Sequence, residues 1–497
     1  MPDGKIYPEA PAGEAIVPPM LPRWLRRALW LLLLLILAVA ALALRIACSF
    51  ETLPVWPLVE LGPVEPQLLF RDVRVFPATG HEFLEHQDVL VRAGRITALT
   101  ATGGPLPDGP TRIIEGDGTQ TLLPGLVDAH VHLLSSGGAP WQAYHFVPEH
   151  NLEAHLYAGV TTVFDLGGFP GQLEELATRV ESGELAGPRI FHTGSPITAP
   201  GSHPLPAAQA LLPWPAGQLL GFIIPTAATP AEARAAVAAM AAEPVDYVKA
   251  ICEHIPAESP AMDEATLSAA ITAAHEHGLK IFVHVGDATQ AVMAAQAGAD
   301  VLAHGPRDRL SPEQVAALAK TRVPIVMTMA GWIGVHEIGA GSYEPSALDR
   351  AITPPELLDA VTGAAGRRLD ATPPIGAMAR EVDPAVMRGN ARVLYEAGVP
   401  LLIGTDSALP GAYPGGGLHE ELRLLHEAGV PVSELLLAAT SRAAAIVAAE
   451  PDFGRVAPGL VADLLLVEGD PREDIGALTR IVKVVRAGRV VQRLDRP

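Results

Sequence analysis

Short apolar runs alternate with helical runs over residues 123–450. The helical runs are rich in Ala, Leu and Glu, as in PAEARAAVAAMAAE and PEQVAALAKT. Alternation of this kind predicts βα units that build a parallel sheet. Eight apolar runs are expected to be the strands of that sheet: GLVDAHVHL, VTTVFDLGG, RIFHTGS, DYVKAIC, KIFVHVG, VLAHG, PIVMTMA and PLLIGTDS.

Eight βα units over this length fit one TIM barrel with insertions. A doubly wound sheet would also alternate, but it needs a Gly-rich phosphate-binding turn after its first strand, and the sequence has none there. Two long connections, 196–229 and 331–390, are rich in Pro and Gly. Connections of this length are usually functional lids or flexible insertions. We therefore predict an α/β fold with a (β/α)8 barrel over residues 123–450.

Both flanks of the barrel carry a different pattern of short strands broken by Gly, Pro and Asp. Residues 67–122 contain LLFRDVRVF and DVLVRAGRITAL, and residues 451–497 contain DLLLVEG and RIVKVVRAGRVVQ. These two segments are expected to be β structure. Residues 49–66, which are rich in Pro and acidic residues, are predicted to be a linker.

The N-terminal part is uniformly apolar over residues 28–44, ALWLLLLLILAVAALAL, and three arginines precede this run. Its length is at the short end for a membrane span. We predict a cytoplasmic N-terminus and transmembrane anchor over 1–48, with the remaining chain outside the cytoplasm, periplasmic or extracellular, because positive charge stays inside. Signal-peptide cleavage is the alternative, since Ala41-Leu42-Ala43 resembles a cleavage site.

Charge and cysteine content narrow the classes further. The net charge of −20 argues against a nucleic-acid partner, which requires clustered Lys and Arg. Two cysteines, Cys48 and Cys252, cannot form a disulfide framework. Apolar residues make up 49% of the chain, enough for a large core. The sequence is compatible with a homo-oligomer as well as with a monomer.

Two histidine pairs share the spacing H-x-H but differ in context. His130 and His132 end a strand, where residues i and i+2 point the same way, at the barrel end that carries chemistry. The pair is therefore a candidate metal site. His275 and His277 end a helical run before Gly278, where residues i and i+2 point about 200° apart. They are expected to be charges near a helix C-terminus rather than ligands.

Further candidate ligands end other strands. His284 ends IFVHV, His304 ends VLAH and Asp406 ends LLIGTD, and all three are ligand types for divalent ions. Lys249 lies inside the apolar run VDYVKAI, in a chain with five lysines and thirty arginines. Burying a lysine costs several kcal/mol unless it is neutralised or paired, so this one calls for a partner or a function.

These residues stand in segments that resemble the amidohydrolase superfamily, in particular its imidazolonepropionase-like and prolidase-like branch. The resemblance rests on LLPGLVDAHVHL, AGVTTVFDLGG, LAHG, IGTDS, HEAGVPVSELLLAATSRAA and GRVAPGLVADLLLVEGDP. It implies that the two flanking β segments form one composite β-sandwich. It also implies two divalent ions, for which zinc is the default metal with N and O ligands, while manganese, iron and cobalt remain open.

The resemblance further implies the ligand set and the chemistry. One ion is expected on His130, His132 and Asp406 and the other on His284 and His304, bridged by Lys249 as a CO2-derived carbamate. Such ions lower the pKa of a bound water to roughly 7. Asp406 is expected to accept the proton of that water and to return one to the leaving nitrogen.

Candidates for substrate binding are fewer. His203, in the segment ITAPGSHP, is expected to contact the substrate carbonyl or an end group and to act in catalysis. Tyr144 follows the first strand, and Arg307, which follows His304, could bind a substrate carboxylate. A surface role is the alternative for His203 and for Arg307.

The predicted function is hydrolysis of a carbon–nitrogen bond, in an amide or cyclic amide of a small molecule or short peptide, by metal-activated hydroxide. A Xaa-Pro-type dipeptidase and an esterase or lactonase are alternatives on the same site. A non-catalytic binding protein that has lost its metal is the remote alternative. Fold analogy cannot name the substrate, because one barrel hosts many reactions.

Overall fold

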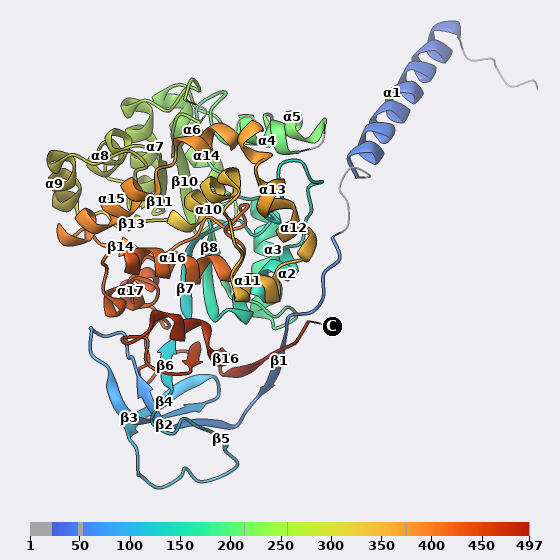
Figure 1. The fold of residues 1–497 in the computed structure, drawn as a ribbon. Helices are drawn as coiled ribbons and strands as arrows, with labels where there is room; N and C mark the ends of the chain where they lie inside the picture. Colours follow the sequence, from blue (N-terminus) through green and yellow to red (C-terminus); the bar gives the residue numbers. More distant parts are fainter. Residues whose placement is uncertain (1–21, 48–52, 213, 256, 373–374, 497) are drawn as a thin grey trace, which may run out of the picture. The chain divides into compact units, whose positions relative to one another are not determined.

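The computed structural model describes residues 22–47, 53–212, 214–255, 257–372 and 375–496 (Figure 1). Its contacts divide the chain into an N-terminal unit, residues 1–49, and a body, residues 50–497. Each unit has its own contacts, so the two are described separately.

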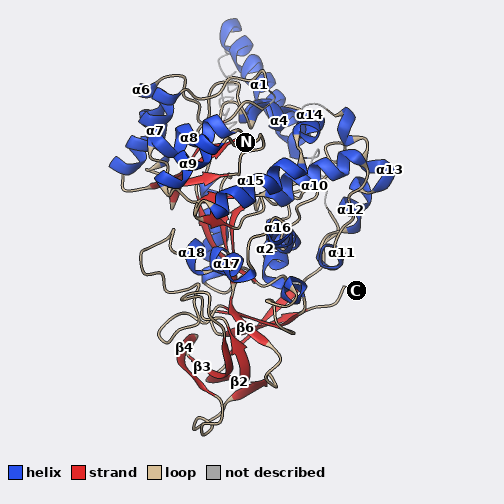
Figure 2. Ribbon diagram, turned by 60° about the vertical axis from the view of Figure 1, so that its left-hand side comes forward, coloured by secondary structure: helices blue, strands red, loops and turns tan. Residues whose placement is uncertain are grey.

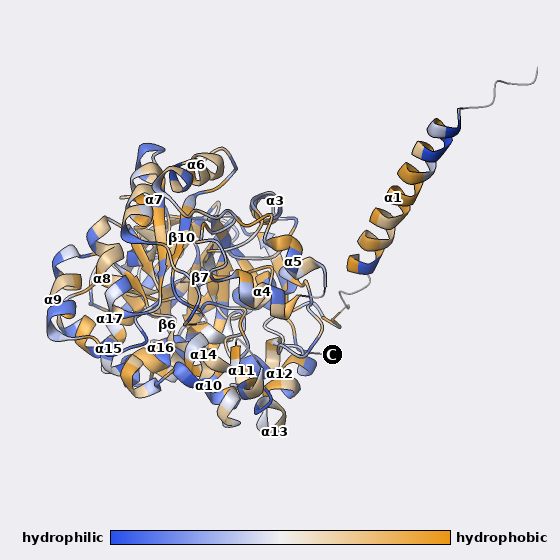
Figure 3. Ribbon diagram, turned by 90° about the horizontal axis from the view of Figure 1, so that it is seen from above, coloured by the Kyte–Doolittle hydropathy of each residue, from blue (hydrophilic) through white to orange (hydrophobic). Residues whose placement is uncertain are grey.

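The N-terminal unit holds one long helix, α1 (Arg23–Ala47). Its stretch Arg23–Ile46 is long and apolar enough to cross a membrane, and none of it is buried inside the protein. Figure 3 shows hydrophobic colour along the helix, with a hydrophilic end at the arginines. A membrane anchor and a signal sequence share these properties, so both expectations stay predictions.

All eight strands expected in the barrel region are present, which confirms the α/β class. They form a three-stranded and a five-stranded parallel sheet. Isolated parallel bridges, Val131 to Ser407 and Ile197 to Ala250, join the two sheets at both edges and place the strands in a ring. In chain order the strands are β7 (Leu126–Val131), β8 (Val160–Asp165), β9 (Arg189–His192), β10 (Tyr247–Cys252), β11 (Lys280–Val285), β12 (Val301–Ala303), β13 (Ile325–Val326) and β14 (Leu401–Leu402).

Alternation along the strands decides which side chains point into the ring. In β10 and β11, Tyr247 and Phe282 belong to one apolar cluster, with Val127, Ala129 and Phe164. Val248 and Val283 belong to the other cluster, which contains the surrounding helices. Successive side chains of a strand point to opposite faces. Lys249 and His284 therefore share the inward direction of Tyr247 and Phe282.

Helices surround these strands, as Figure 2 shows. They are α2 (Pro148–Tyr157), α3 (Pro170–Glu181), α4 (Leu205–Leu211), α5 (Ala216–Leu220), α6 (Pro230–Met240), α7 (Glu264–Glu276), α8 (Ala288–Ala297), α9 (Pro312–Thr321), α10 (Met329–Ala340), α11 (Ala347–Ile352), α12 (Pro355–Val361), α13 (Gly363–Gly366), α14 (Ile375–Glu381), α15 (Pro384–Glu396), α16 (Gly416–Glu427), α17 (Val432–Ala438) and α18 (Ser441–Ala444), with short 3-10 turns at Leu369–Ala371 and Ile475–Thr479.

Of the two long connections, 331–390 is largely helical, whereas 196–229 holds two short helices between irregular stretches. The connection 196–229 contains α4 and α5, and 331–390 contains most of α10 and the helices α11 to α14. Buried side chains explain the second case, because Val335, Ile338 and Leu358 share an apolar cluster with Tyr413. A connection with its own core is a packed insertion, not a flexible one.

A nine-stranded sheet combines both flanks of the body. Strands β15 and β6 pair antiparallel, so the sheet includes Leu123 and Pro124, beyond the expected boundary at residue 122. Its strands are β1 (Val59–Val64), β2 (Gln67–Val75), β3 (Leu84–Arg92), β4 (Arg95–Ala101), β5 (Arg112–Glu115), β6 (Thr121–Pro124), β15 (Leu464–Val467), β16 (Ile481–Arg486) and β17 (Arg489–Arg493).

Strand β1 corrects the linker predicted over residues 49–66. It pairs antiparallel with β17, from Val59 opposite Arg493 to Val64 opposite Arg489. Val59 is buried in the main core. Burial of this apolar side chain favours a strand here, although the neighbouring residues have a composition typical of turns. The linker therefore ends before Val59, and the β module begins there.

The β module buries both faces of its central strand. Leu464 and Leu466 of β15 belong to an apolar cluster of the module itself, whereas Leu465 and Val467 belong to the cluster that includes the barrel helices. Hydrogen bonds connect all nine strands into one sheet, and Leu68 and Val89 of one half share an apolar cluster with Val485 and Val490 of the other, so the composite sandwich stays a prediction. The module is thus fastened to the barrel through one face of β15.

Candidate active site

Asp406 joins the first pair of candidate ligands after the carboxyl end of β14. Its Oδ1 atom lies 3.2 Å from Nε2 of His130 and 3.0 Å from Nε2 of His132. Ligand atoms of His130, His304 and Asp406 lie within 4.8 Å of one another, which suits a single ion. Asp406 therefore lies beside both histidines of the first H-x-H pair, and their role as ligands stays a prediction.

The second pair of candidate ligands adjoins the first. Nε2 of His304 lies 3.0 Å from Nδ1 of His284. The rings of His130 and His304 are 4.6 Å apart between centroids, so the two pairs form one continuous cluster. The cluster contains all four predicted histidines, from strands far apart in the sequence.

Lys249 points into the ring of strands, in the direction of Tyr247 and Phe282. Its side chain is buried, and Nζ has no hydrogen-bond partner among the described residues. Burial lowers the pKa of Lys249 to about 7, although the charges of Asp406, Asp165 and Glu253 oppose the shift. An unpaired buried amine beside histidines and a carboxylate fits a site completed by a bound group.

His132 and His304 are held through their outer ring nitrogens. Nδ1 of His132 lies 3.2 Å from the carbonyl oxygen of Gly167, and Nδ1 of His304 lies 2.7 Å from Oγ1 of Thr328. Burial lowers the pKa of His130 and of His304 well below the usual value. Neutral imidazole is the form that binds metal, and a fixed outer nitrogen orients it. The residues present therefore fit divalent ions.

Asp128 of β7 forms hydrogen bonds with Thr405, the residue before Asp406. Its carboxylate accepts hydrogen bonds from the backbone N–H of Thr405 at 3.0 Å and from the hydroxyl of Thr405 at 2.8 Å. Burial raises the pKa of Asp128 to about 7. This carboxyl connects β7 to the segment that carries Asp406. Asp128 lies in the run GLVDAHVHL, where the local pattern gives no sign of this role.

The backbone at two ligands adopts the left-handed region. His304 has φ 93° and Asp406 has φ 61°. Non-glycine residues occupy this region at a cost of about 1–3 kcal/mol and cluster at functional sites. Both residues lie after a strand end and belong to the cluster.

Glu253 is a site residue that the sequence analysis missed. It follows β10 directly, is buried, and bonds both Nε2 of His284 and Nη2 of Arg307. Burial opposes ionisation, but the charges of Arg307 and His284 outweigh it and lower the pKa of Glu253 to about 2. The guanidinium of Arg307 lies 4.2 Å from the ring centre of Trp332.

The three substrate-binding candidates differ in surroundings. The ring of His203 lies 5.2 Å from that of His284, and burial lowers the pKa of His203 to about 3. Arg307 is engaged by Glu253, so it is not the exposed loop arginine that the alternative supposed. The hydroxyl of Tyr144 lies 3.4 Å from the carbonyl oxygen of Leu134. Substrate contact stays a prediction for all three.

The histidines of the cluster differ in how far their side chains are exposed to solvent. The side chain of His132 is 30% exposed, against 1% for His130 and 6% for His284. A substrate can therefore reach the cluster from the side of His132, past the loops that follow β7 and β8.

The second H-x-H pair lies elsewhere. His275 is in the last turn of α7 and His277 is its C-cap, as expected. Nε2 of His275 lies 2.9 Å from Asp300, and its side chain is 46% exposed. An exposed ion pair at a helix end explains this residue without a metal.

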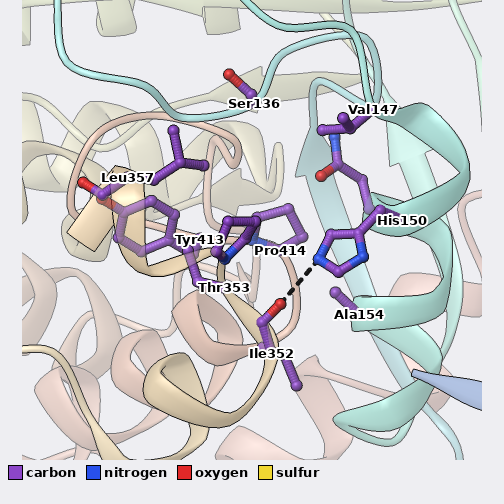
Figure 4. Close-up of a pocket in the computed structure, with 11 residues that line it drawn as sticks. Ser136, Val147, His150, Ala154, Ile352, Thr353, Leu357, Tyr413 and Pro414 are labelled. Carbon is purple, nitrogen blue, oxygen red and sulfur yellow. Dashed lines mark hydrogen bonds between the residues drawn. The ribbon is translucent and has the colours of Figure 1, made fainter. Parts of the chain in front are cut away.

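A narrow pocket lies behind the loop that follows β7 (Figure 4). Nε2 of His150 lies 2.9 Å from the carbonyl oxygen of Ile352 there. The amide of Asn151, which also lines it, donates to the carbonyl oxygens of Leu133 at 2.8 Å and Ser135 at 2.6 Å. The pocket shares no lining residue with the histidine cluster, and these bonds hold the loop next to His132.

Residues 121–491 match the amidohydrolase family. The chain belongs to this family. The matched range contains both the ring of strands and the histidine cluster, and it extends into the C-terminal part of the β module.

Individual amidohydrolase relatives match over short stretches. A D-hydantoinase of Streptomyces coelicolor is 37% identical over 82 residues, 16% of this chain and 17% of the relative. An allantoinase of Streptomyces avermitilis is 33% identical over 100 residues, 20% of each chain. The alignments thus span at most about a fifth of these relatives' length.

Solved structures match over most of the chain. A Xaa-Pro dipeptidase with bound methionine has a TM-score of 0.68 at 22% identity, covering 85% of this chain and 99% of that one. A prolidase complexed with N-methylphosphonate-L-proline has a TM-score of 0.66 at 23% identity, covering 86% and 100%. An ochratoxinase of A. niger has a TM-score of 0.64 at 19% identity, covering 87% and 96%. At such identities the likeness shows the fold.

Proposed function

We propose that this amidohydrolase-family chain is a metal-dependent hydrolase that cleaves a carbon–nitrogen bond in an amide or cyclic amide. The observation that carries the proposal is the convergence of four histidines and Asp406 around the unpaired amine of Lys249. The family match supports hydrolysis of carbon–nitrogen bonds. A binding protein without metal would have no need for this set of ligands in one buried place.

The proposed ligand roles follow the family resemblance, and the clustering of the candidate residues supports them. One ion would be held by His130, His132 and Asp406, and a second by His284 and His304, with the carbamate of Lys249 between them. When bound, divalent ions supply a water of lowered pKa and polarise the substrate carbonyl. Zinc suits these N and O donors.

Asp406 is the proposed acid–base residue. Its carboxylate lies between His130 and His132, beside the exposed side of the cluster. From there it can take a proton from the attacking water and deliver it to the leaving nitrogen. His203, buried beside His284, is proposed to orient the substrate carbonyl, and Tyr144 and Arg307 are proposed to contact the substrate.

For the substrate we favour a cyclic amide, because the short relatives are named a hydantoinase and an allantoinase. A Xaa-Pro dipeptide is the second candidate, supported by the residue types at the strand ends that this chain shares with the prolidase-like branch. Esters and lactones are attacked by the same chemistry and belong in the same panel.

We also propose that α1 anchors the chain in a membrane, with the body outside the cytoplasm. Support comes from the apolar length of Arg23–Ile46 and from the arginines at its N-terminal end. The partners proposed are thus a bilayer and a small substrate.

The test is turnover by the full-length protein, expressed with zinc and bicarbonate and purified in detergent. Hydantoin, allantoin, N-acyl amino acids, Xaa-Pro dipeptides and lactones are assayed before and after chelation, and again after zinc is restored. We expect zinc-dependent hydrolysis of an amide. Metal-free protein that hydrolyses nothing in the panel, and that takes up no zinc when it is supplied, would overturn the proposal.

A further inference from the structure

Glu253 is a carboxylate buried next to the histidine cluster, and burial of a charge is costly unless the charge is compensated. It is the first residue after β10, four positions beyond Lys249, and it is 1% exposed. Its two carboxylate oxygens are used separately: Oε2 bonds Nε2 of His284 and Oε1 bonds Nη2 of Arg307. A buried carboxylate is costly unless it is paired and hydrogen-bonded, and here it is both.

The bond to His284 decides which nitrogen of that ring faces the cluster. An ionised carboxylate only accepts hydrogen bonds, so Nε2 of His284 carries the proton and Nδ1 keeps its lone pair. Nδ1 is the atom that lies 3.0 Å from Nε2 of His304. The bond from Glu253 therefore leaves the free lone pair of His284, on Nδ1, facing the side where the ligands converge.

We infer that Glu253 is a positioning residue that holds His284 in the tautomer and orientation needed to bind an ion. The inference rests on the proposed metal-dependent function and adds a residue to it. A ligating histidine usually donates its second N–H to a carboxylate or carbonyl, and losing that partner typically weakens metal binding by about 10–100-fold.

The surroundings of Glu253 fix its side chain from several directions. Gly286, just after β11, leaves the space that the carboxylate fills, and a Cβ atom there would overlap Oε1. The hydroxyl of Ser202 donates to the carbonyl oxygen of Glu253 at 3.1 Å, next to His203. Arg307, stacked on Trp332, closes the other side. Glu253 thus links the second ligand pair to the loop that carries His203.

Gly286 provides a variant that displaces the carboxylate without removing it. Gly286→Ala keeps every polar group of the site but fills the space of Oε1, and its backbone lies outside the left-handed region, so alanine is compatible with it. Glu253→Ala removes the carboxylate, and Glu253→Gln keeps an acceptor oxygen for His284. A matched control is Glu434→Gln, which breaks a part-buried ion pair with Arg442; the ion-pair partners of Glu434, Arg442 and His81, are not among the candidate ligands.

The experiment measures zinc affinity of the full-length protein by competition with a chromophoric chelator, with circular dichroism and thermal unfolding to show that each variant is folded. We expect Glu253→Ala and Gly286→Ala to weaken zinc binding about 10–100-fold, Glu253→Gln to lose less, and Glu434→Gln to match the wild type.

The outcomes separate the two proposals. Wild-type protein that binds no zinc overturns the proposed function. Wild-type protein that binds zinc, with folded Glu253→Ala and Gly286→Ala variants of equal affinity, overturns the role of Glu253 and leaves the proposed function standing. Weakening in Glu434→Gln equal to that in Glu253→Ala would also overturn it, because the loss would then be a general effect of breaking an ion pair.

Discussion

Nε2 of His304 lies 3.0 Å from Nδ1 of His284, and the other nitrogen of each ring already has a protein partner, Thr328 or Glu253. Two imidazole lone pairs at that distance repel each other unless a proton or a cation lies between them. With Glu253 accepting from His284, Nδ1 of His284 offers a lone pair that either a proton on Nε2 of His304 or a bound cation satisfies. The unpaired Nζ of Lys249 in the same interior is the observation that favours a bound group.

Metal stoichiometry is the first prediction. Full-length protein expressed with zinc and bicarbonate should carry about two zinc ions per chain by elemental analysis, because two groups of ligands adjoin. Lys249→Ala should lower the ratio to about one, since the bridging carboxylate would be lost. The double variant His275→Ala, His277→Ala should keep the wild-type ratio, as its histidines lie at an exposed helix end. A ratio near one zinc ion per wild-type chain would contradict the bridging role of Lys249, which would then be only a buried lysine.

Replacing Asp406 by Asn tests the acid–base role. The amide keeps an oxygen for an ion but cannot take a proton, so kcat should fall by about 10²–10⁴-fold. Zinc content, measured on the same preparation, should fall much less than kcat. A rate equal to that of the wild type would show that another group moves the proton.

The strand positions and the ligand histidines could be predicted because both depend on short-range patterns. Each barrel strand is an apolar run, and a ligand at the end of such a run must appear at the same end of the ring. Lys249 was identifiable for the same reason, since a charged residue inside a buried strand stands out from its neighbours.

Other features depend on partners distant in sequence. Glu253 lies 31 residues from His284 and 54 from Arg307, so the run ICEHIP gave no sign of the ion pair. Strand β1 pairs with β17 across nearly the whole chain, and Arg489 donates to the carbonyl oxygen of Gly62, 427 residues away. The composition of residues 49–66 predicted a linker because only the distant strand makes this segment a strand.

Membrane attachment of α1 is the next prediction. Full-length protein should remain in the membrane pellet after extraction with high salt and with alkaline carbonate, because an apolar helix of this length inserts rather than binds at the surface. A variant that lacks residues 1–49 should appear in the soluble fraction. Release of the full-length protein by carbonate, or recovery of a shortened chain, would favour a cleaved signal peptide.

Glu421 of α16 predicts a pH effect on stability. It is fully buried, and its Oε2 accepts from the backbone N–H of Ala330 at 2.6 Å, at the start of α10. Oε1 has no partner among the described residues. Burial raises the pKa of Glu421 from 4.5 to about 8, although hydrogen bonds from Ala330 and Met329 oppose the shift.

Between pH 4.5 and about 8 the folded state therefore holds a proton on Glu421 that the unfolded state has released. Stability falls with rising pH wherever the folded state binds more protons, so this residue lowers the free energy of unfolding progressively across that window. Glu421→Gln mimics the neutral carboxyl and cannot ionise. The variant should gain stability relative to the wild type as the pH rises from 5 to 8.

Urea unfolding at several pH values between 5 and 8 measures this difference. Glu427→Gln is the matched control, because its carboxylate is on the same helix, pairs with Arg423 at the surface and is not among the charges that raise the pKa of Glu421. Its difference from the wild type should stay constant over the window. If the difference between Glu421→Gln and the wild type is equally flat, Glu421 is ionised in the folded protein, and a cation near the start of α10 must balance its charge.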